Sequence, residues 1–277
     1  MLTRPVLLVL SIALLLVACR PTPSDPIEYL HREDSIIIQM LTVDADASEI
    51  ERRLPVPEFT LYGDGTLIYQ SVSEDGTRLL ETRLPADAVR ELLEGIVDEG
   101  FLDFIYEQPA PEGASGPTTF IYAHTRDLAN AVSVRGADEP LPEDAGEEFD
   151  QYRTVQAFVA TLRSLDPVAL GASQPADFLP ASLVLQVMHI GEPPRQGAPP
   201  LPPAADIDFA QILPEGSGPV QHGVDGDLAA SLWSQFRFQG DNVGTLIGPL
   251  QQGSQTYLIA FVPLLPFYEN FPEFNLQ

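Results

Sequence analysis

The sequence contains no lysine, and all 14 of its basic residues are arginines. Against them stand 40 aspartate and glutamate residues, which give a formal net charge of −26. Walker-type nucleotide binding, Schiff-base catalysis and serine–lysine dyads all need a lysine and are therefore excluded. A chain this acidic cannot neutralise a run of phosphates, so nucleic acid is excluded as a partner.

Cysteine is almost as scarce, because Cys19 is the only one in the chain. A single cysteine excludes an intrachain disulfide and a cysteine-based zinc site. Prolines (27) outnumber glycines (20), which indicates rigid connections and short elements. Hydrophobic residues make up 44%, enough for a folded core, so the chain is not globally disordered.

The N-terminus has the layout of a secretory signal peptide over residues 1–18. Arg4 supplies a positive charge, and an apolar run broken only by Ser11 follows from residue 5 to residue 17. A run of this length is too short to span a hydrocarbon layer of about 30 Å as a helix. It has the proportions of the apolar region of a signal peptide.

The run ends in Leu16-Val17-Ala18-Cys19, which resembles the lipobox of bacterial prolipoproteins. The resemblance implies diacylglycerol transfer to the Cys19 thiol, cleavage after Ala18 and acylation of the new amino group, commonly with palmitate. Two or more acyl chains are enough for stable attachment. The resemblance therefore predicts a lipid-anchored protein at the extracytoplasmic face of the cell membrane; an uncleaved anchor or a fortuitous cysteine is the alternative.

The mature chain would start at Cys19 with 13 arginines and 40 acidic residues, a net charge of −27. Residues 19–34 include three closely spaced prolines and predict a semi-rigid tether. The remaining divisions that we predict are an α+β domain over 35–166, a linker over 167–181, and a second α+β part over 182–277 with a proline-rich loop over 191–205.

The folded region predicts an α+β class, with an antiparallel meander and hairpins packed on a few amphipathic helices. Gly63 and Gly65 around Asp64 are expected to supply the positive φ angles of a tight turn. The pattern over residues 44–53 is ambiguous and is compatible with a short helix. Strands are predicted over 35–41, 59–62, 66–69, 77–83, 118–123, 129–134, 182–187 and 256–260, and helices over 85–99, 144–165 and 227–236.

The segment 57–165 also resembles a module of unknown function in bacterial lipoproteins. The resemblance depends on the F-x-L-Y-G-D-G hairpin at 59–65, the helix ending near Gly100 and the strand starting at Thr118. It implies a fold and a localisation but no activity. Strand 182–187 repeats the pattern of 35–40, and 256–260 that of 118–123, which indicates either a degenerate duplication or the ordinary likeness of apolar strands.

Residues that could support catalysis form no coherent set. Of the four histidines, His222 is the best candidate, because it lies in a predicted polar, glycine-rich loop before the 227–236 helix; the alternative is a turn capped by Asp225 or Asp227. His31, His124 and His189 have no metal-ligand spacing. Ser115 and Ser217 are flanked by glycine but are not in a G-x-S-x-G elbow.

A calcium site and an aromatic patch are further alternatives. Asp44, Asp46 and Ser48 match the first ligand positions of an EF-hand, but Glu49 and Pro55 occupy its glycine and glutamate positions. The acidic stretch 138–150 is expected to place negative charge at the start of a helix. The C-terminal aromatics either form a partner-binding patch or pack across the body: Tyr257, Phe261, Phe267, Tyr268, Phe271 and Phe274.

Together these features predict a membrane-anchored extracytoplasmic lipoprotein that binds a protein partner or acts as a scaffold, without catalysis. The alternatives are an extracytoplasmic hydrolase using carboxylates or His222, and a calcium-stabilised module. The sequence predicts no cofactor and no metal ligand, and its only site residue with an assigned chemistry is Cys19, the point of lipid attachment.

The anchor has a direct test in a Cys19→Ala variant produced from the full chain. Without a thiol no thioether to diacylglycerol can form, so we expect loss of lipid labelling and release from the membrane fraction. Metabolic labelling with a fatty acid and fractionation measure both effects. A variant that is processed and retained on the membrane like the unaltered chain would contradict the anchor.

Overall fold

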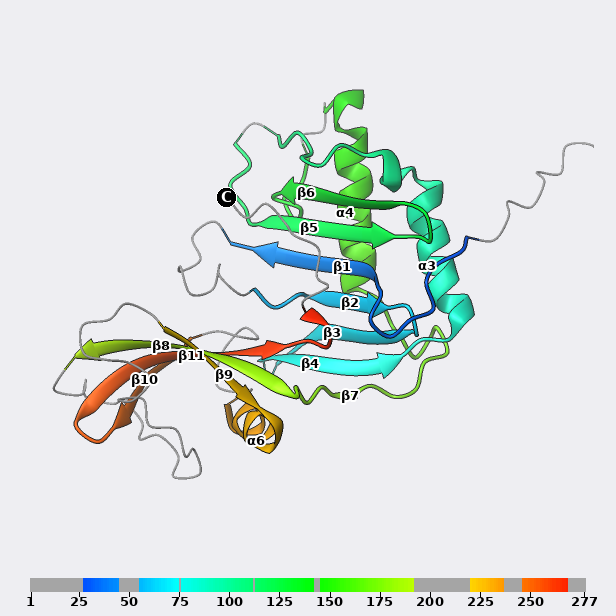
Figure 1. Ribbon diagram of the computed structural model, residues 1–277. Helices are drawn as coiled ribbons and strands as arrows, with labels where there is room; N and C mark the ends of the chain where they lie inside the picture. The colour runs from blue at the N-terminus through cyan, green and yellow to red at the C-terminus, as the bar shows by residue number, and fades with distance from the viewer. Residues whose placement is uncertain are drawn as a thin grey trace, which may run out of the picture.

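The computed structural model describes residues 27–44, 55–74, 76–111, 113–141, 145–191, 220–236 and 246–268. These residues form an α+β fold with two antiparallel sheets and three α-helices (Figure 1). Residues 1–26, with the predicted signal peptide and Cys19, lie outside the described residues. The elements are β1 (Ile36–Val43), β2 (Phe59–Tyr62), β3 (Thr66–Ser73), β4 (Gly76–Arg83), α3 (Ala86–Asp98), η1 (Phe101–Asp103), β5 (Thr118–His124), β6 (Ala129–Arg135), η2 (Glu147–Phe149), α4 (Asp150–Arg163), β7 (Ala176–Asp177), β8 (Ser182–Gly191), β9 (Val220–Asp225), α6 (Gly226–Phe236), β10 (Leu246–Gln252) and β11 (Gln255–Leu264).

The larger sheet has seven strands in the order β6-β5-β1-β2-β3-β4-β7. The predicted meander is confirmed as β2, β3 and β4, and the predicted hairpin as β5 and β6. β1 lies between β2 and β5, and six of its eight residues are buried. Its β-branched run suits this place, because a strand covered on both faces needs apolar side chains on both.

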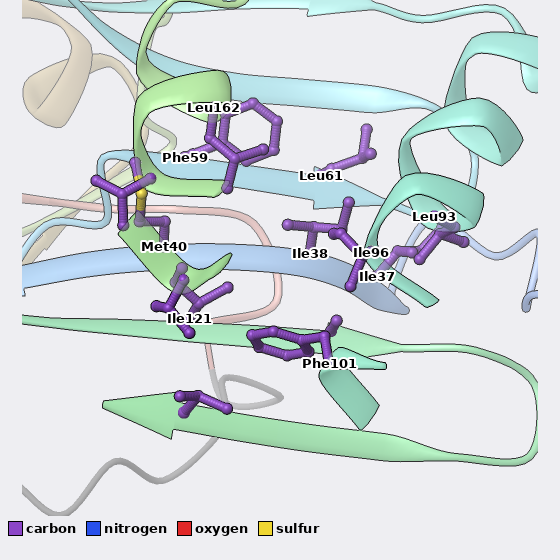
Figure 2. Packing of buried hydrophobic residues seen from close by; sticks show 14 of the residues in the cluster. Ile37, Ile38, Met40, Phe59, Leu61, Leu93, Ile96, Phe101, Ile121 and Leu162 are labelled. Atoms are coloured by element: carbon purple, nitrogen blue, oxygen red, sulfur yellow. The ribbon is translucent and has the colours of Figure 1, made fainter. Parts of the chain in front are cut away.

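One face of this sheet is covered by α3 and α4, which run across the strands (Figure 1). The α3 face that packs inward is an apolar stripe, with Val89, Leu93 and Ile96 buried and Val97 at its margin. Figure 2 shows that side chains of the sheet, such as Ile38, converge with those of both helices into one core.

The other face of the larger sheet packs against a four-stranded sheet with the order β10-β11-β8-β9. The predicted strands at 182–187 and 256–260 are confirmed as parts of β8 and β11, and α6 follows β9. Trp233 on α6 is buried and donates from Nε1 to the Phe178 carbonyl at 3.1 Å, so it serves the core. This second core joins Ile36, Tyr62, Ile68 and Leu79 of the larger sheet to Leu183, Leu185, Val187, Ile259, Phe261 and Trp233.

The segment predicted as a linker, 167–181, is built into this arrangement. Its residues 176–177 form β7, which pairs with β4 at the edge of the larger sheet. Phe178 directly follows and is buried in the second core. The chain between the two predicted parts therefore contributes to both the sheet and the packing.

The two parts share one pairing and differ in another. β1 pairs antiparallel with β5, and β8 pairs antiparallel with β11, as the sequence echoes would place them. The outer partner of β5 follows it in sequence, whereas β10 precedes β11. In the first part α3 follows the three-stranded meander, and in the second α6 directly follows β9.

The turn between β2 and β3 uses its two glycines differently from the prediction. Gly65 has a positive φ of 90°, but Gly63 does not. Gly63 is needed for space, because a Cβ there would lie 1.8 Å from the Leu30 carbonyl oxygen. Asp64 accepts hydrogen bonds from the Thr66 backbone at 2.9 Å and hydroxyl at 3.0 Å and pairs with Arg83 at 3.1 Å.

The second helix starts later than the predicted residue 144. Gly146 is extended, a 3₁₀ turn covers 147–149, and α4 begins at Asp150. Asp150 is the only acidic residue in its first turn, so little of the stretch 138–150 lies inside the helix. The buried face of α4 is formed by Tyr152, Val155, Val159 and Leu162.

Much of the C-terminal aromatic group packs across the body rather than forming an exposed patch. Tyr257 and Phe261 are buried on β11. Tyr62 donates its hydroxyl to the Pro266 carbonyl at 2.7 Å, and its ring meets Phe267 edge-on at 6.3 Å. Tyr268 is 51% exposed. Phe271 and Phe274 lie outside the described residues, as do most of the predicted 44–53 helix and 191–205 loop.

The contact of Gly63 with Leu30 predicts a sharp effect of one methyl group. Gly63→Ala should lower the free energy of unfolding by about 2–3 kcal/mol, because backbone atoms must move. That corresponds to a fall in Tm of roughly 4–12 °C, measured by calorimetry. Gly223→Ala is the matched control: its Cβ meets nothing within 4 Å, so a change within about 0.5 kcal/mol is expected. Equal melting of the two variants would contradict the packing.

Candidate functional site

A groove of about 580 Å³ lies between α3 and α4 on the outer side of the helix layer. The groove forms because each helix packs its apolar stripe on the sheet. The flanks of the two helices then face each other across the space between them. The residues that line it are Glu91, Leu92, Gly95, Ile96, Glu99, Arg153, Thr154, Ala157, Phe158, Thr161 and Leu162.

The floor of the groove is apolar. Leu92 and Ile96 come from α3, and Phe158 and Leu162 come from α4. Phe158 is held by an edge-on contact with the buried ring of Phe101, with the centroids 5.7 Å apart. The floor is thus an outward continuation of the first core.

Each side of the groove is a ridge of three residues at i, i+4 and i+8, which share one helix face. On α3 the ridge is Glu91, Gly95 and Glu99, and on α4 it is Arg153, Ala157 and Thr161. The middle position of each ridge is small: a Cβ at Gly95 would meet nothing within 4 Å, and Ala157 is exposed. The groove is therefore most accessible at its centre.

The charge of the groove is net acidic. Glu91 and Glu99 are exposed and have no ion-pair partner among the described residues. Arg153 forms an ion pair with Asp150 one turn earlier, so its charge is already balanced. A ligand that enters the groove would contact apolar side chains at the floor and two unpaired carboxylates on the α3 side.

α4 is held in position at its C-terminal end by Arg163. The guanidinium donates from Nε to Glu58 at 2.8 Å, from a second nitrogen to Thr42 at 3.2 Å, and also pairs with Asp138. Burial works against its charge, but the hydrogen bonds and charges of Glu58 and Asp138 outweigh it and raise the pKa of Arg163. The helix is thereby tied to β1, the start of β2 and the end of β6.

His222 does not lie in the predicted loop. It is an exposed residue of β9, an edge strand of the four-stranded sheet, where it pairs across from Leu185. Backbone pairing with β8 overrides the turn preference of its glycine-rich neighbours. α6 then starts at Gly226, directly after Asp225. Within the described residues, no acid or serine hydrogen-bonds to the His222 side chain.

The other candidates from the sequence are scattered. Ser115 and Gly116 donate their backbone N–H groups to the Glu139 carboxylate, at 3.3 and 2.7 Å, so this glycine–serine loop is a structural turn. His31 contacts the ring of Tyr29, His124 ends β5, and His189 lies on β8. Ser217, Asp46 and Ser48 lie outside the described residues. In the described part of the chain, no three His, Cys, Asp or Glu residues gather closely enough to hold a metal ion.

The groove itself is absent from the sequence-based expectations. The signal was present in the helix patterns, because Gly95 and Ala157 interrupt the outer faces of two amphipathic helices. Only the packing of both helices on one face of the sheet brings the two small residues into the same groove (Figure 1). Among the described residues, no helix has both the length and the apolarity to cross a membrane.

Comparison with known proteins adds no relative: no family model matches the chain, and no curated protein or solved structure is significantly similar to it.

The open space at Gly95 predicts a stabilising substitution. Gly95→Ala should raise the free energy of unfolding by about 0.5–1 kcal/mol, because alanine restricts the unfolded chain and favours the helix. Gly100→Ala, just beyond the same helix, should lower it by about 1–2 kcal/mol because φ is +76° there. Chemical denaturation of both variants measures the two effects. If Gly95→Ala instead lowered the free energy of unfolding, the space beside Gly95 would be occupied, and this result would contradict the open groove.

Proposed function

We propose that the protein is a lipid-anchored, extracytoplasmic binding protein whose α3–α4 groove receives an amphipathic helix of a partner protein. The observation that carries the proposal is the form of the groove: an apolar floor between two ridges whose middle residues are Gly95 and Ala157. Carboxylates, a guanidinium and hydroxyls lie along the edges of the groove. At the edges they can select between partners by charge and hydrogen bonding.

A helix is the occupant that this form favours. Helices pack with their axes about 8–10 Å apart, and small residues at the crossing allow the closest approach. A third helix laid along the groove would bury its apolar stripe on the floor formed by Leu92, Ile96 and Phe158. This is the helix-in-groove mode of recognition, in which a few apolar anchors at helical spacing supply most of the affinity.

The charge of the groove favours a cationic partner. Glu91 and Glu99 are eight residues apart on α3, which separates them by about 12 Å along the helix. Basic residues seven or eight positions apart on the incoming helix would meet both carboxylates. The net charge of −27 on the chain that starts at Cys19 also attracts a basic partner from a distance and raises its rate of association.

The proposed anchor determines where this binding would take place. The sequence Leu16-Val17-Ala18-Cys19 and the proline-rich residues after it support attachment through acyl chains, with the folded part outside the membrane. The groove would then be presented to proteins of the extracytoplasmic space or to the exposed parts of membrane proteins.

The groove is tested with a synthetic, fluorescein-labelled amphipathic helix that has a leucine stripe flanked by two arginines eight positions apart. Fluorescence anisotropy measures its binding to the chain. Ala157→Trp fills the centre of the groove and should weaken binding at least about tenfold, the effect of losing roughly 1.4 kcal/mol of contact. Ala160→Trp is the matched control, since Ala160 is an exposed residue of α4 that does not line the groove.

A second pair of measurements separates shape from charge. Glu91→Gln combined with Glu99→Gln should weaken binding and flatten its salt dependence, because exposed charge pairs are screened by salt. A peptide with glutamates in place of the arginines should not bind. Equal affinity of the Ala157→Trp and Ala160→Trp variants would overturn the groove as the binding site.

A further inference from the structure

We propose that one end of the seven-stranded sheet faces the lipid bilayer and meets it at the level of the headgroups. We call it the tether end and define it by residues 27–35, the turns 63–65 and 125–128, and residues 83–90. The inference rests on the proposed anchor at Cys19, because it concerns how an anchored molecule is oriented.

The chain enters the fold at this end and is fastened there. The Arg126 backbone donates to the Glu28 carbonyl at 2.9 Å, and the two side chains form an ion pair. Tyr29 is buried in the first core, the Leu30 carbonyl packs on Gly63, and Gly63 donates to the Ser35 carbonyl at 2.8 Å. The first described residues are thus fixed to the sheet and cannot add to the reach of a tether.

The chain between Cys19 and the first described residue, Ile27, is short. Seven residues lie between Cys19 and Ile27, so the chain takes eight residue steps from one to the other and even fully extended spans at most about 26–29 Å. In the polyproline geometry that prolines favour, the same eight steps would span about 25 Å. The anchored sulfur must lie in the headgroup region, so the tether end cannot be farther from it than this.

In this orientation the opposite end of the sheet is the part farther from the membrane. β1, β3 and β4 each have eight residues, a length of about 26 Å. The β3–β4 connection lies at the end of the strands away from the 63–65 turn, since Thr66 pairs with Arg83 and Ser73 with Gly76. Val72, beside that connection, is 81% exposed.

Charge favours the same orientation. Four arginines at the tether end form ion pairs with carboxylates of the same end: Arg32 with Asp34, Arg83 with Asp64, Arg90 with Asp87, and Arg126 with Glu28. The tether end thus holds four arginines and six acids, against 14 and 40 in the whole chain. Arginines thus balance a larger share of the acids here than in the chain as a whole, so anionic headgroups repel the tether end less than the average of this acidic molecule.

The tether end also exposes apolar side chains. Leu128, in the turn between β5 and β6, is 60% exposed, and Leu30 is 36% exposed. Two leucines could not hold a protein on a bilayer alone, but an anchored protein already has the membrane within reach. With the strands upright, α3 and α4 run along the membrane plane, so the groove opens to the side (Figure 1).

The orientation is tested on the chain that starts at Cys19, coupled through its only cysteine to maleimide lipid in phosphatidylcholine vesicles, with and without phosphatidylglycerol. Leu128→Trp and Val72→Trp are matched variants, because each puts a tryptophan at an exposed apolar site, at opposite ends of the sheet. Both retain Trp233 as a constant background. Quenching by headgroup spin-labelled lipid reports contact with the bilayer surface.

We expect quenching of Leu128→Trp to exceed that of Val72→Trp by at least about twofold, given the separation of the two ends. Uncoupled chains mixed with the same vesicles should show no difference. Equal quenching, or stronger quenching of Val72→Trp, would overturn the orientation. Because the coupling is chemical, this outcome is independent of acylation in cells, which the Cys19→Ala experiment tests, and of helix binding in the groove. Circular dichroism melting of both variants shows that each is folded.

Discussion

The burial of both faces of the seven-stranded sheet is the constraint on which the rest of the structure depends. An antiparallel sheet commonly leaves one face to water, but six of the eight β1 residues are buried here. α3 and α4 cover one face, and the four-stranded sheet with α6 covers the other. The segment 167–181 and the residues after β11 are consequently drawn into the packing, since they connect and close the two layers.

The same constraint produces the groove. Each helix needs only one stripe to cover the sheet, so the flanks of α3 and α4 are left facing each other. Long side chains at the middle of these flanks would fill the space, whereas Gly95 and Ala157 leave it open. Arg163 holds α4 at a set position through Glu58 and Asp138. A binding surface thus arises as a consequence of how the core is covered.

Local patterns predicted most of the elements, because strands and helices in this chain have strong apolar periods and clear turn residues. The failures have particular causes. Glycine and aspartate around His222 indicate a loop, but pairing with β8 supplies backbone hydrogen bonds that a loop would lack. The acids before residue 150 look like a helix start, but Gly146 is extended. Gly63 looks like a turn glycine, but its role depends on Leu30, 33 residues earlier in the chain.

The sequence by itself determined the α+β class, the strong helix 86–98 and the central strand, because these depend on side-chain periodicity within a few residues of one another. It also carries the pattern Leu16-Val17-Ala18-Cys19, on whose resemblance to a lipobox the proposed anchor rests, and the chemistry that this resemblance implies needs a thiol and small neighbours but no fold. The tertiary structure alone decided the order of the strands, the stacking of the two sheets and the opposition of Gly95 and Ala157. These depend on contacts between residues far apart in sequence, which no local pattern encodes.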